Sequence, residues 1–152
     1  MNRMTADTNL FIHAADPDSP HHARARQFIQ STSSRLAQKE SEFVLCELVL
    51  VELYMQLRNP AIFKKPYSAK ESADYCLALK SNPAWRCIDY EVGVSQKLWQ
   101  WAGTTKAGFR RIIDARLGLT LRHHGVTELA TANVKDFTEF GFDRVWNPLV
   151  DA

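Results

Sequence analysis

The sequence predicts an α/β fold with a mostly parallel sheet, and two observations lead to that prediction. Short apolar segments with strand character alternate with longer segments of helical character along the whole chain. This alternation is typical of βαβ units, whose strands run parallel. The chain has 152 residues, of which 45% are hydrophobic, and this is enough for one domain with a buried core. We therefore expect a single domain over residues 1–152.

The predicted strands are short apolar segments bounded by polar or turn-forming residues. In order, they are residues 4–6 with the polar end 7–9, then 43–45, 85–88, 128–131 and 144–146. The predicted helices are residues 21–31, 47–58, 68–80, 91–102 and 111–123. Ser68 and Glu71 form a capping box at one helix start, whereas Asn59-Pro60 and Gly125 are helix stops. Residues 32–41 are expected to form a loop or a frayed helix end, and residues 103–108 a loop.

Charge and cysteine content restrict the possible function only weakly. The net charge of +2 permits nucleic-acid binding without indicating it. The three cysteines are far apart and form no CxxC pair, which argues against a disulfide framework and against a sulfur-rich metal site. No apolar run approaches the roughly 18–20 residues that span a bilayer, and no secretory signal begins the chain. We therefore expect a cytoplasmic protein with no membrane partner.

Four acidic residues lie at strand ends or among apolar neighbours, where a solvated carboxylate is not expected. They are Asp7, Glu52, Asp114 and Asp136. Each has a structural alternative. Asp7 and Asp136 suit turns or caps, Glu52 can be a rim residue or half of an ion pair, and Asp114 can stabilise a helix dipole or pair with Arg116.

The four acids gain significance as a set. Asp7 and Asp136 follow strands, and Glu52 and Asp114 lie on helices that can pack at the same sheet edge. Carboxylates that converge there repel one another unless a cation compensates their charge. Oxygen ligands suit Mg²⁺ or Mn²⁺, and such ions bind phosphate oxygens and activate water. The sequence therefore predicts a metal-dependent phosphodiester chemistry.

The segments around these acids resemble, in order, the four motifs of PIN domains. The quoted segments are Thr5-Ala6-Asp7-Thr8-Asn9, Val51-Glu52-Leu53, Ile113-Asp114-Ala115-Arg116-Leu117 and the stretch from Leu129 to Phe137. The ending Val145-Trp146-Asn147-Pro148 is similar to that of a subgroup of VapC toxins. Each motif alone is weak, but the ordered set is specific and covers roughly Met4 to Leu149.

The resemblance implies an α/β/α sandwich with a parallel sheet and a Mg²⁺- or Mn²⁺-dependent ribonuclease that cleaves RNA. It also implies a homodimer and a small VapB-like antitoxin as partner. Asp7, Glu52 and Asp114 match the metal-binding acids, and Asp136 shares the fourth position with Asn133. Asn9 and Thr131 are expected to support the site by hydrogen bonding. If Asn133 replaces the main fourth acid, the site carries one charge less, which weakens a second metal.

Other readings stay open at this point. They include a housekeeping PIN nuclease that processes RNA, an inactive PIN scaffold, and a phosphatase with Asp7 as nucleophile, for which Asn9 stands where a second Asp is needed. Tyr54, Tyr67 and Trp101 are candidates for stacking on bases. Cations are candidates for holding RNA around the acids, although such residues are usually just a solvated face; they are Arg58, Lys64, Lys65, Lys106, Arg110, Arg111 and Arg116.

Overall fold

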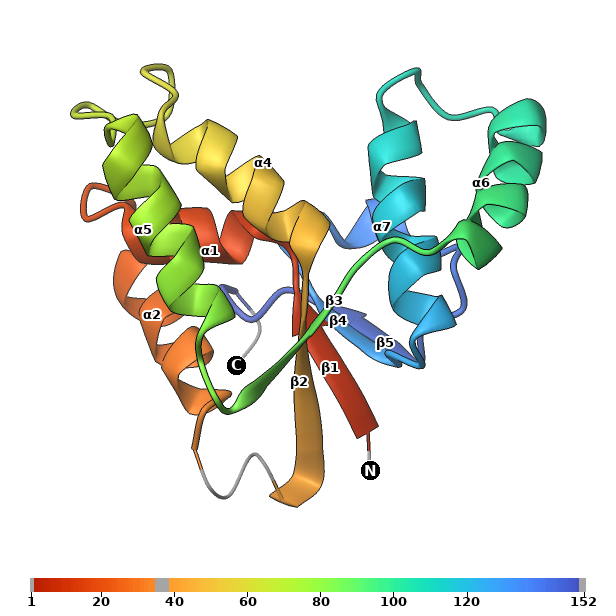
Figure 1. The fold of residues 1–152 in the computed structure, drawn as a ribbon, viewed down its shortest axis with the longest axis horizontal. Helices are drawn as coiled ribbons and strands as arrows, with labels where there is room; N and C mark the ends of the chain where they lie inside the picture. Colours follow the sequence, from red (N-terminus) through yellow and green to blue (C-terminus); the bar gives the residue numbers. More distant parts are fainter. Residues whose placement is uncertain (1, 35–38, 151–152) are drawn as a thin grey trace.

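The computed structural model, which describes residues 2–34 and 39–150, contains a five-stranded sheet with helices on both faces (Figure 1). All paired strands run parallel, in the spatial order β3-β2-β1-β4-β5. Their bounds are β1 Asn2–Ala6, β2 Ser41–Cys46, β3 Trp85–Ile88, β4 Glu128–Ala130 and β5 Arg144–Trp146. The predicted α/β/α architecture is confirmed, and the sheet is fully parallel rather than mostly so.

The helices form two layers. Figure 1 shows α1, α2, α4 and α5 on one face of the sheet, and α6 and α7 on the other. Their bounds are α1 Thr8–Ala15, α2 His22–Ser31, α4 Glu47–Leu57, α5 Ala69–Lys80, α6 Val92–Thr104 and α7 Arg111–His123, with a 3₁₀ helix η1 at Val134–Phe137. None of the described helices is long and apolar enough to cross a membrane.

Local sequence signals set several helix ends where they were predicted. Ser68 accepts a hydrogen bond from the Glu71 N–H, and the Glu71 carboxylate accepts one from the Ser68 N–H, so the capping box of α5 is confirmed. Helix α7 ends in a Schellman motif, in which the Val126 N–H donates to the Leu121 carbonyl. Gly125 adopts φ +76° there, a conformation that favours glycine.

The structure corrects three predictions. The polar end of the first strand, residues 7–9, is not a strand, because Asp7 caps a new helix, α1, that begins at Thr8. Helix α6 continues to Thr104 instead of ending before residue 103. The predicted loop over 32–41 partly lies outside the described residues, and its last residue, Ser41, begins β2.

The core lies between the sheet and the two helix layers. Leu10 and Phe11 of α1 are 0% and 1% exposed, which explains why a short helix follows β1 without a linker. On the opposite face, Leu117 and Leu121 of α7 are also buried. Burying these side chains fixes both helix layers on the sheet and places their ends beside the carboxyl ends of the strands.

Candidate active site at the carboxyl ends of the strands

Parallel pairing brings the chain just beyond β1 and β4 together. Ala6 and Ala130 are register partners, and the Asp7 N–H donates to the Ala130 carbonyl at 2.9 Å. Asp7 and Thr131 are therefore neighbours, although 124 positions separate them. The carboxyl ends of these two strands define the centre of the candidate site.

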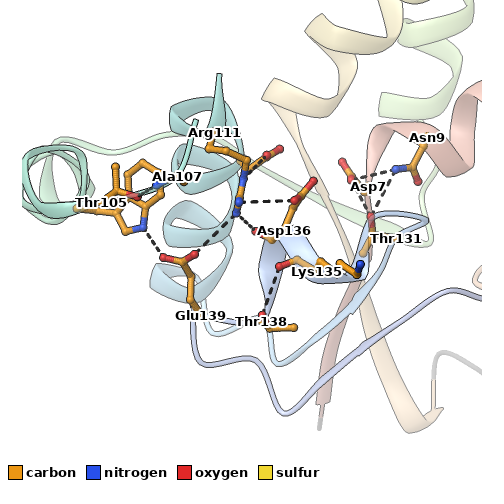
Figure 2. A network of polar contacts seen from close by, with 12 residues as sticks. Asp7, Asn9, Thr105, Ala107, Arg111, Thr131, Lys135, Asp136, Thr138 and Glu139 are labelled. Carbon is orange, nitrogen blue, oxygen red and sulfur yellow. Dashed lines mark hydrogen bonds and ion pairs between the residues drawn. The ribbon is translucent and has the colours of Figure 1, made fainter. Parts of the chain in front are cut away.

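The Asp7 corner consists of Asp7, Asn9 and Thr131 (Figure 2). Oδ2 of Asp7 accepts hydrogen bonds from the Thr131 hydroxyl at 2.9 Å and from the Asn9 amide at 3.2 Å. Oδ1 accepts the Thr8 N–H at 2.7 Å, which is the N-cap bond of α1. Asp7 thus caps α1 and also lies at the centre of the candidate site, so the two readings of this residue are compatible.

Asn9 and Thr131 also fix the chain that follows β4. The Asn9 side-chain oxygen accepts the Ala132 N–H at 3.1 Å, and the Thr131 hydroxyl accepts the Asn133 N–H at 3.0 Å. Both residues therefore connect Asp7 to the segment that leads to Asp136. Asn9 and Thr131 thus form hydrogen bonds both to Asp7 and to the chain that follows β4.

Burial dominates the electrostatics of Asp7. Its side chain is 8% exposed, and this desolvation raises the pKa of its carboxyl, which Asp114 and Asp136 raise further. The hydrogen bonds from Thr131 and Thr8 oppose that rise. The ionised form of this carboxyl is therefore poorly solvated, and no cation among the described residues contacts it, which favours binding of an external cation.

Glu52 lies on α4 and is partly buried. No described residue forms a hydrogen bond or an ion pair with its carboxylate, so the structure does not support the ion-pair alternative for this residue. Burial raises its pKa to about 7, and repulsion from Asp7 and Asp114 contributes. At neutral pH this carboxyl is poised between its two protonation states, which is common for site residues and rare for surface ones.

Asp114 lies in the first turn of α7 and is paired with a cation from its own helix. Its Oδ2 accepts a hydrogen bond from Nε of Arg111 at 3.0 Å. Burial and the nearby Asp136 raise the pKa of Asp114, whereas Arg111 lowers it. Arg116 does not pair with Asp114, because its guanidinium lies 4.1 Å from the centre of the Tyr90 ring.

The Arg111 guanidinium, which is bonded to Asp114, also contacts the fourth acid, Asp136. Nη2 of Arg111 donates to the backbone carbonyl of Asp136 at 2.6 Å, and Nη1 lies 3.6 Å from the Asp136 carboxylate. Nη2 also lies 3.8 Å from Glu139. We call Arg111, Asp114, Asp136 and Glu139 the Arg111 clamp; Figure 2 shows it connecting α7 with η1 and the residues after it.

The four predicted acids therefore gather from four separate segments. Their mutual influence on pKa links Asp7 with Glu52, Asp114 and Asp136, and Asp114 with Asp136. Within residues 2–34 and 39–150, however, no three acidic, histidine or cysteine side chains already enclose a complete ion site. An ion would have to draw the carboxylates together. The oxygen-only donor set suits Mg²⁺ or Mn²⁺.

The remaining predicted residues lie around this centre or away from it. Asn133 is exposed, and its backbone N–H rather than its side chain is bonded to Thr131. Lys106 and Arg110 are exposed on the segment before α7, with Arg110 stacked 5.5 Å from the Phe109 ring centre. Arg58 stacks on Tyr54 of its own helix, at 5.4 Å.

Sequence reasoning missed the contacts that organise the clamp. Arg111 was expected to hold RNA, but its guanidinium contacts protein carboxylates. Glu139 was not among the candidate residues, and its exposed carboxylate accepts a 2.6 Å hydrogen bond from the Trp101 indole of α6. One signal was readable, because Arg111 and Asp114 have the i,i+3 spacing of side chains that meet on a helix.

The comparisons with known proteins agree with this geometry. The PIN domain family profile matches residues 4–143. The chain is 40% identical over 146 residues to ribonuclease VapC24 of Mycobacterium tuberculosis, and the match covers 96% of this chain and 97% of that protein.

Solved structures with low sequence identity share the fold. The crystal structure of VapC20 of Mycobacterium tuberculosis, a toxin that cleaves the sarcin–ricin loop, superposes with a TM-score of 0.67 at 15% identity, covering 91% of this chain and 95% of the other. The DNA-bound VapBC structure from Salmonella typhimurium matches with a TM-score of 0.60 at 17% identity, covering 97% and 99%. From its sequence motifs, its fold and these relatives, the chain belongs to the PIN-domain family, in its VapC branch.

Proposed function

We propose that this protein is a Mg²⁺- or Mn²⁺-dependent endoribonuclease and the toxin of a toxin–antitoxin pair. The observation that carries the proposal is the convergence of Asp7, Glu52, Asp114 and Asp136 at the carboxyl ends of β1 and β4. The relative that is 40% identical over nearly the full length is a ribonuclease. An inactive scaffold would have no reason to retain this costly concentration of poorly solvated carboxylates.

Asp7, Glu52 and Asp114 would hold the ion, and Asp136 with Asn133 would contribute the fourth position. Their fit rests on the donor chemistry, because all of these groups offer oxygen atoms and the unfavourable repulsion among them calls for a cation. When bound, the ion would supply positive charge to a phosphate oxygen and make a nearby water more acidic. Thr131 and Asn9 would keep the Asp7 carboxylate oriented.

The chain's own residues would do the remaining work. Without an ion, Glu52 has a pKa raised to about 7, so ion binding near neutral pH would release the proton from this carboxyl. RNA would be held by exposed cations beside the acids, for which Lys106 and Arg110 are placed best, since they directly precede the helix that carries Asp114. Histidine is not required in this scheme.

The partner assignments belong to the same proposal. The solved structures with the same fold include VapBC from Salmonella typhimurium and FitAB, both bound to DNA. By analogy, we propose a VapB-like antitoxin as inhibitory partner and a homodimer as the oligomeric state of this chain. Size measurement of the purified protein, alone and with the product of any neighbouring small reading frame, tests both assignments.

The test of activity uses the purified protein without a partner and a pool of structured and unstructured RNAs. Reactions contain Mg²⁺, Mn²⁺ or EDTA, and the Asp7→Asn protein is run beside the wild type. The Asp74→Asn protein is the matched control, because Asp74 lies exposed on α5 and, among the described residues, forms its ion pair with Lys70 alone. We expect cleavage that needs the metal, survives in Asp74→Asn and disappears in Asp7→Asn.

Failure of cleavage has two distinguishable meanings. If the wild type binds Mn²⁺ and Asp7→Asn does not, the pool lacked the RNA target and the nuclease proposal stands. If the wild type binds no Mn²⁺ and cleaves nothing, the nuclease proposal is wrong and the scaffold reading replaces it.

A further inference from the structure

Arg111 makes more contacts with acidic residues than any other cation described near the site. It contacts two of the four site acids and, in addition, a backbone carbonyl and Glu139. Its side chain is only 24% exposed, so it is not available as a free surface cation. Arg111 is therefore poorly placed to bind RNA directly.

The contacts of Arg111 bridge two segments that are distant in sequence. Nε is bonded to Asp114 on α7, and Nη2 is bonded at 2.6 Å to the carbonyl of Asp136, 25 residues later. Because one planar guanidinium makes both contacts, the distance between α7 and η1 is fixed by a rigid group. A backbone contact is significant here, since it restrains η1 itself and not only one side chain.

The contact chain continues beyond η1 to α6. Glu139 lies between Arg111, at 3.8 Å, and the Trp101 indole, which donates to it at 2.6 Å. Apolar packing supports the same segment, because Phe137 is 1% exposed and the Phe140 ring lies directly against Gly118 of α7. The residues after β4 are thus held on α7 by a polar and an apolar contact together.

Resting on the proposed function, we propose that Arg111 is a positioning residue for the ion site. It holds η1, and with it Asp136, beside Asp114 on α7 before any ion binds. Its positive charge offsets the repulsion between these two acids, which lie close enough to influence each other. An ion that binds to the prearranged acids need not order η1, and this raises its affinity.

The alternative is that Arg111 competes with the ion, as an internal counter-ion for Asp114. The two roles predict opposite effects on ion affinity. Loss of a positioning residue weakens binding, whereas loss of a competitor strengthens it.

The experiment measures Mn²⁺ affinity by titration calorimetry in the wild type, Arg111→Gln, Arg111→Lys and a charge-matched control. The control is Lys135→Gln, because Lys135 is exposed on η1 next to Asp136 and its change removes the same charge. We expect affinity to fall about tenfold in Arg111→Gln, as is common when an outer contact of a metal ligand is lost. Arg111→Lys should recover only part of this, since an ammonium cannot span a carboxylate and a carbonyl. Lys135→Gln should stay within about twofold.

Hydrogen exchange provides a second readout that needs no ion and no RNA. The Asp136 N–H, bonded to the Asn133 carbonyl at 3.0 Å, should exchange faster in both Arg111 variants and normally in Lys135→Gln. Circular dichroism verifies that each variant is folded at the temperature used.

Unchanged or tighter Mn²⁺ binding in Arg111→Gln overturns the proposal, and so does an equal loss in Lys135→Gln. Unchanged exchange of η1 in the Arg111 variants overturns it as well. Absence of Mn²⁺ binding to the wild type contradicts the proposed function instead, and the exchange measurement then still decides whether Arg111 fixes η1.

Discussion

The two sides of the candidate site hold their carboxylates by different means. In the Asp7 corner, one buried carboxylate is oriented by neutral hydrogen-bond donors: the Thr131 hydroxyl, the Asn9 amide and the Thr8 N–H. In the Arg111 clamp, two half-exposed carboxylates share one guanidinium. Neutral donors orient an acid without cancelling its charge, whereas a cation cancels part of it.

This difference suggests that the two sides contribute to ion binding in different ways. The Asp7 corner supplies a buried acid that no described cation contacts, so the charge of its ionised form is poorly solvated and favours a bound cation. The Arg111 clamp supplies acids whose positions depend on the packing of η1 on α7. Glu52 differs from both sides, because neither a neutral donor nor a cation among the described residues contacts its carboxylate. Its pKa is raised to about 7.

The largest effect is expected from Asp7→Asn. Asparagine can still cap α1, so the fold should survive, but the negative charge at the centre of the corner is lost. We expect RNA cleavage to fall by at least about a hundredfold, more than for loss of an outer contact. The melting temperature should not fall, because the substitution removes a buried charge that costs stability. A large drop in melting temperature would instead make Asp7 chiefly structural.

A pH series should distinguish the titration of Glu52 from the contributions of the Asp7 corner and the Arg111 clamp. Because its pKa is raised from the ordinary 4.5 to about 7, the folded protein binds this proton more tightly than the unfolded chain does. The ion-free protein should therefore lose stability as the pH rises from about 4.5 to 7. Mn²⁺ affinity should change the opposite way, falling roughly tenfold per pH unit below about 7, since protons compete with the ion. In Glu52→Gln both slopes should flatten, and steep slopes in that variant would assign the proton to another group.

The apolar support of the Arg111 clamp can be tested with a pair of glycine substitutions. A Cβ at Gly118 would lie 2.7 Å from the Phe140 ring, so Gly118→Ala must displace the segment after η1. We expect a loss of about 1–3 kcal/mol in the free energy of unfolding by denaturant. Gly103→Ala is the control, because a Cβ there has no neighbour within 4 Å and alanine favours the helix. Equal effects of the two substitutions would rule out the close contact as the cause.

The smallest effect is expected from Thr131→Val. Valine keeps the shape of threonine but removes the hydroxyl that donates to Asp7 and accepts from the Asn133 N–H. We expect about 1 kcal/mol of lost stability and roughly tenfold slower cleavage, with Thr131→Ser close to the wild type. The pKa of Asp7 should rise further, because this hydrogen bond lowers it. A Thr131→Ser protein as slow as Thr131→Val would show that the hydroxyl is not the group that acts.

Much of the fold could be predicted from the sequence, since local signals set it. Helix α7 spans the predicted residues, and it ends where predicted because Gly125 supplies the backbone conformation of its C-terminal cap. Helix α1 was missed because it is short and follows β1 directly, so Asp7-Thr8-Asn9 looks like a polar strand end. That these three residues begin a helix is decided by the burial of Leu10 and Phe11 against the core.

The candidate site, like the fold, could be predicted from the sequence only in part. Its acids were found from their motifs, and parallel pairing explains why distant motifs meet. The partners of Arg111 were not found, because its contacts with Asp136 and Glu139 depend on how η1 packs across 25 or more residues of chain. No local pattern specifies such a contact, whereas the Arg111–Asp114 spacing on one helix was visible in the sequence.

The most direct test of the central claim is a crystal structure of the partner-free protein soaked with Mn²⁺, with anomalous scattering used to locate the ion. We predict one Mn²⁺ peak in contact with the carboxylates of both Asp7 and Asp114, while Arg111 keeps its contact with the Asp136 carbonyl. A peak that contacts neither Asp7 nor Asp114, or a site that stays free of Mn²⁺ at millimolar concentration, would contradict the account that the two sides form one ion site.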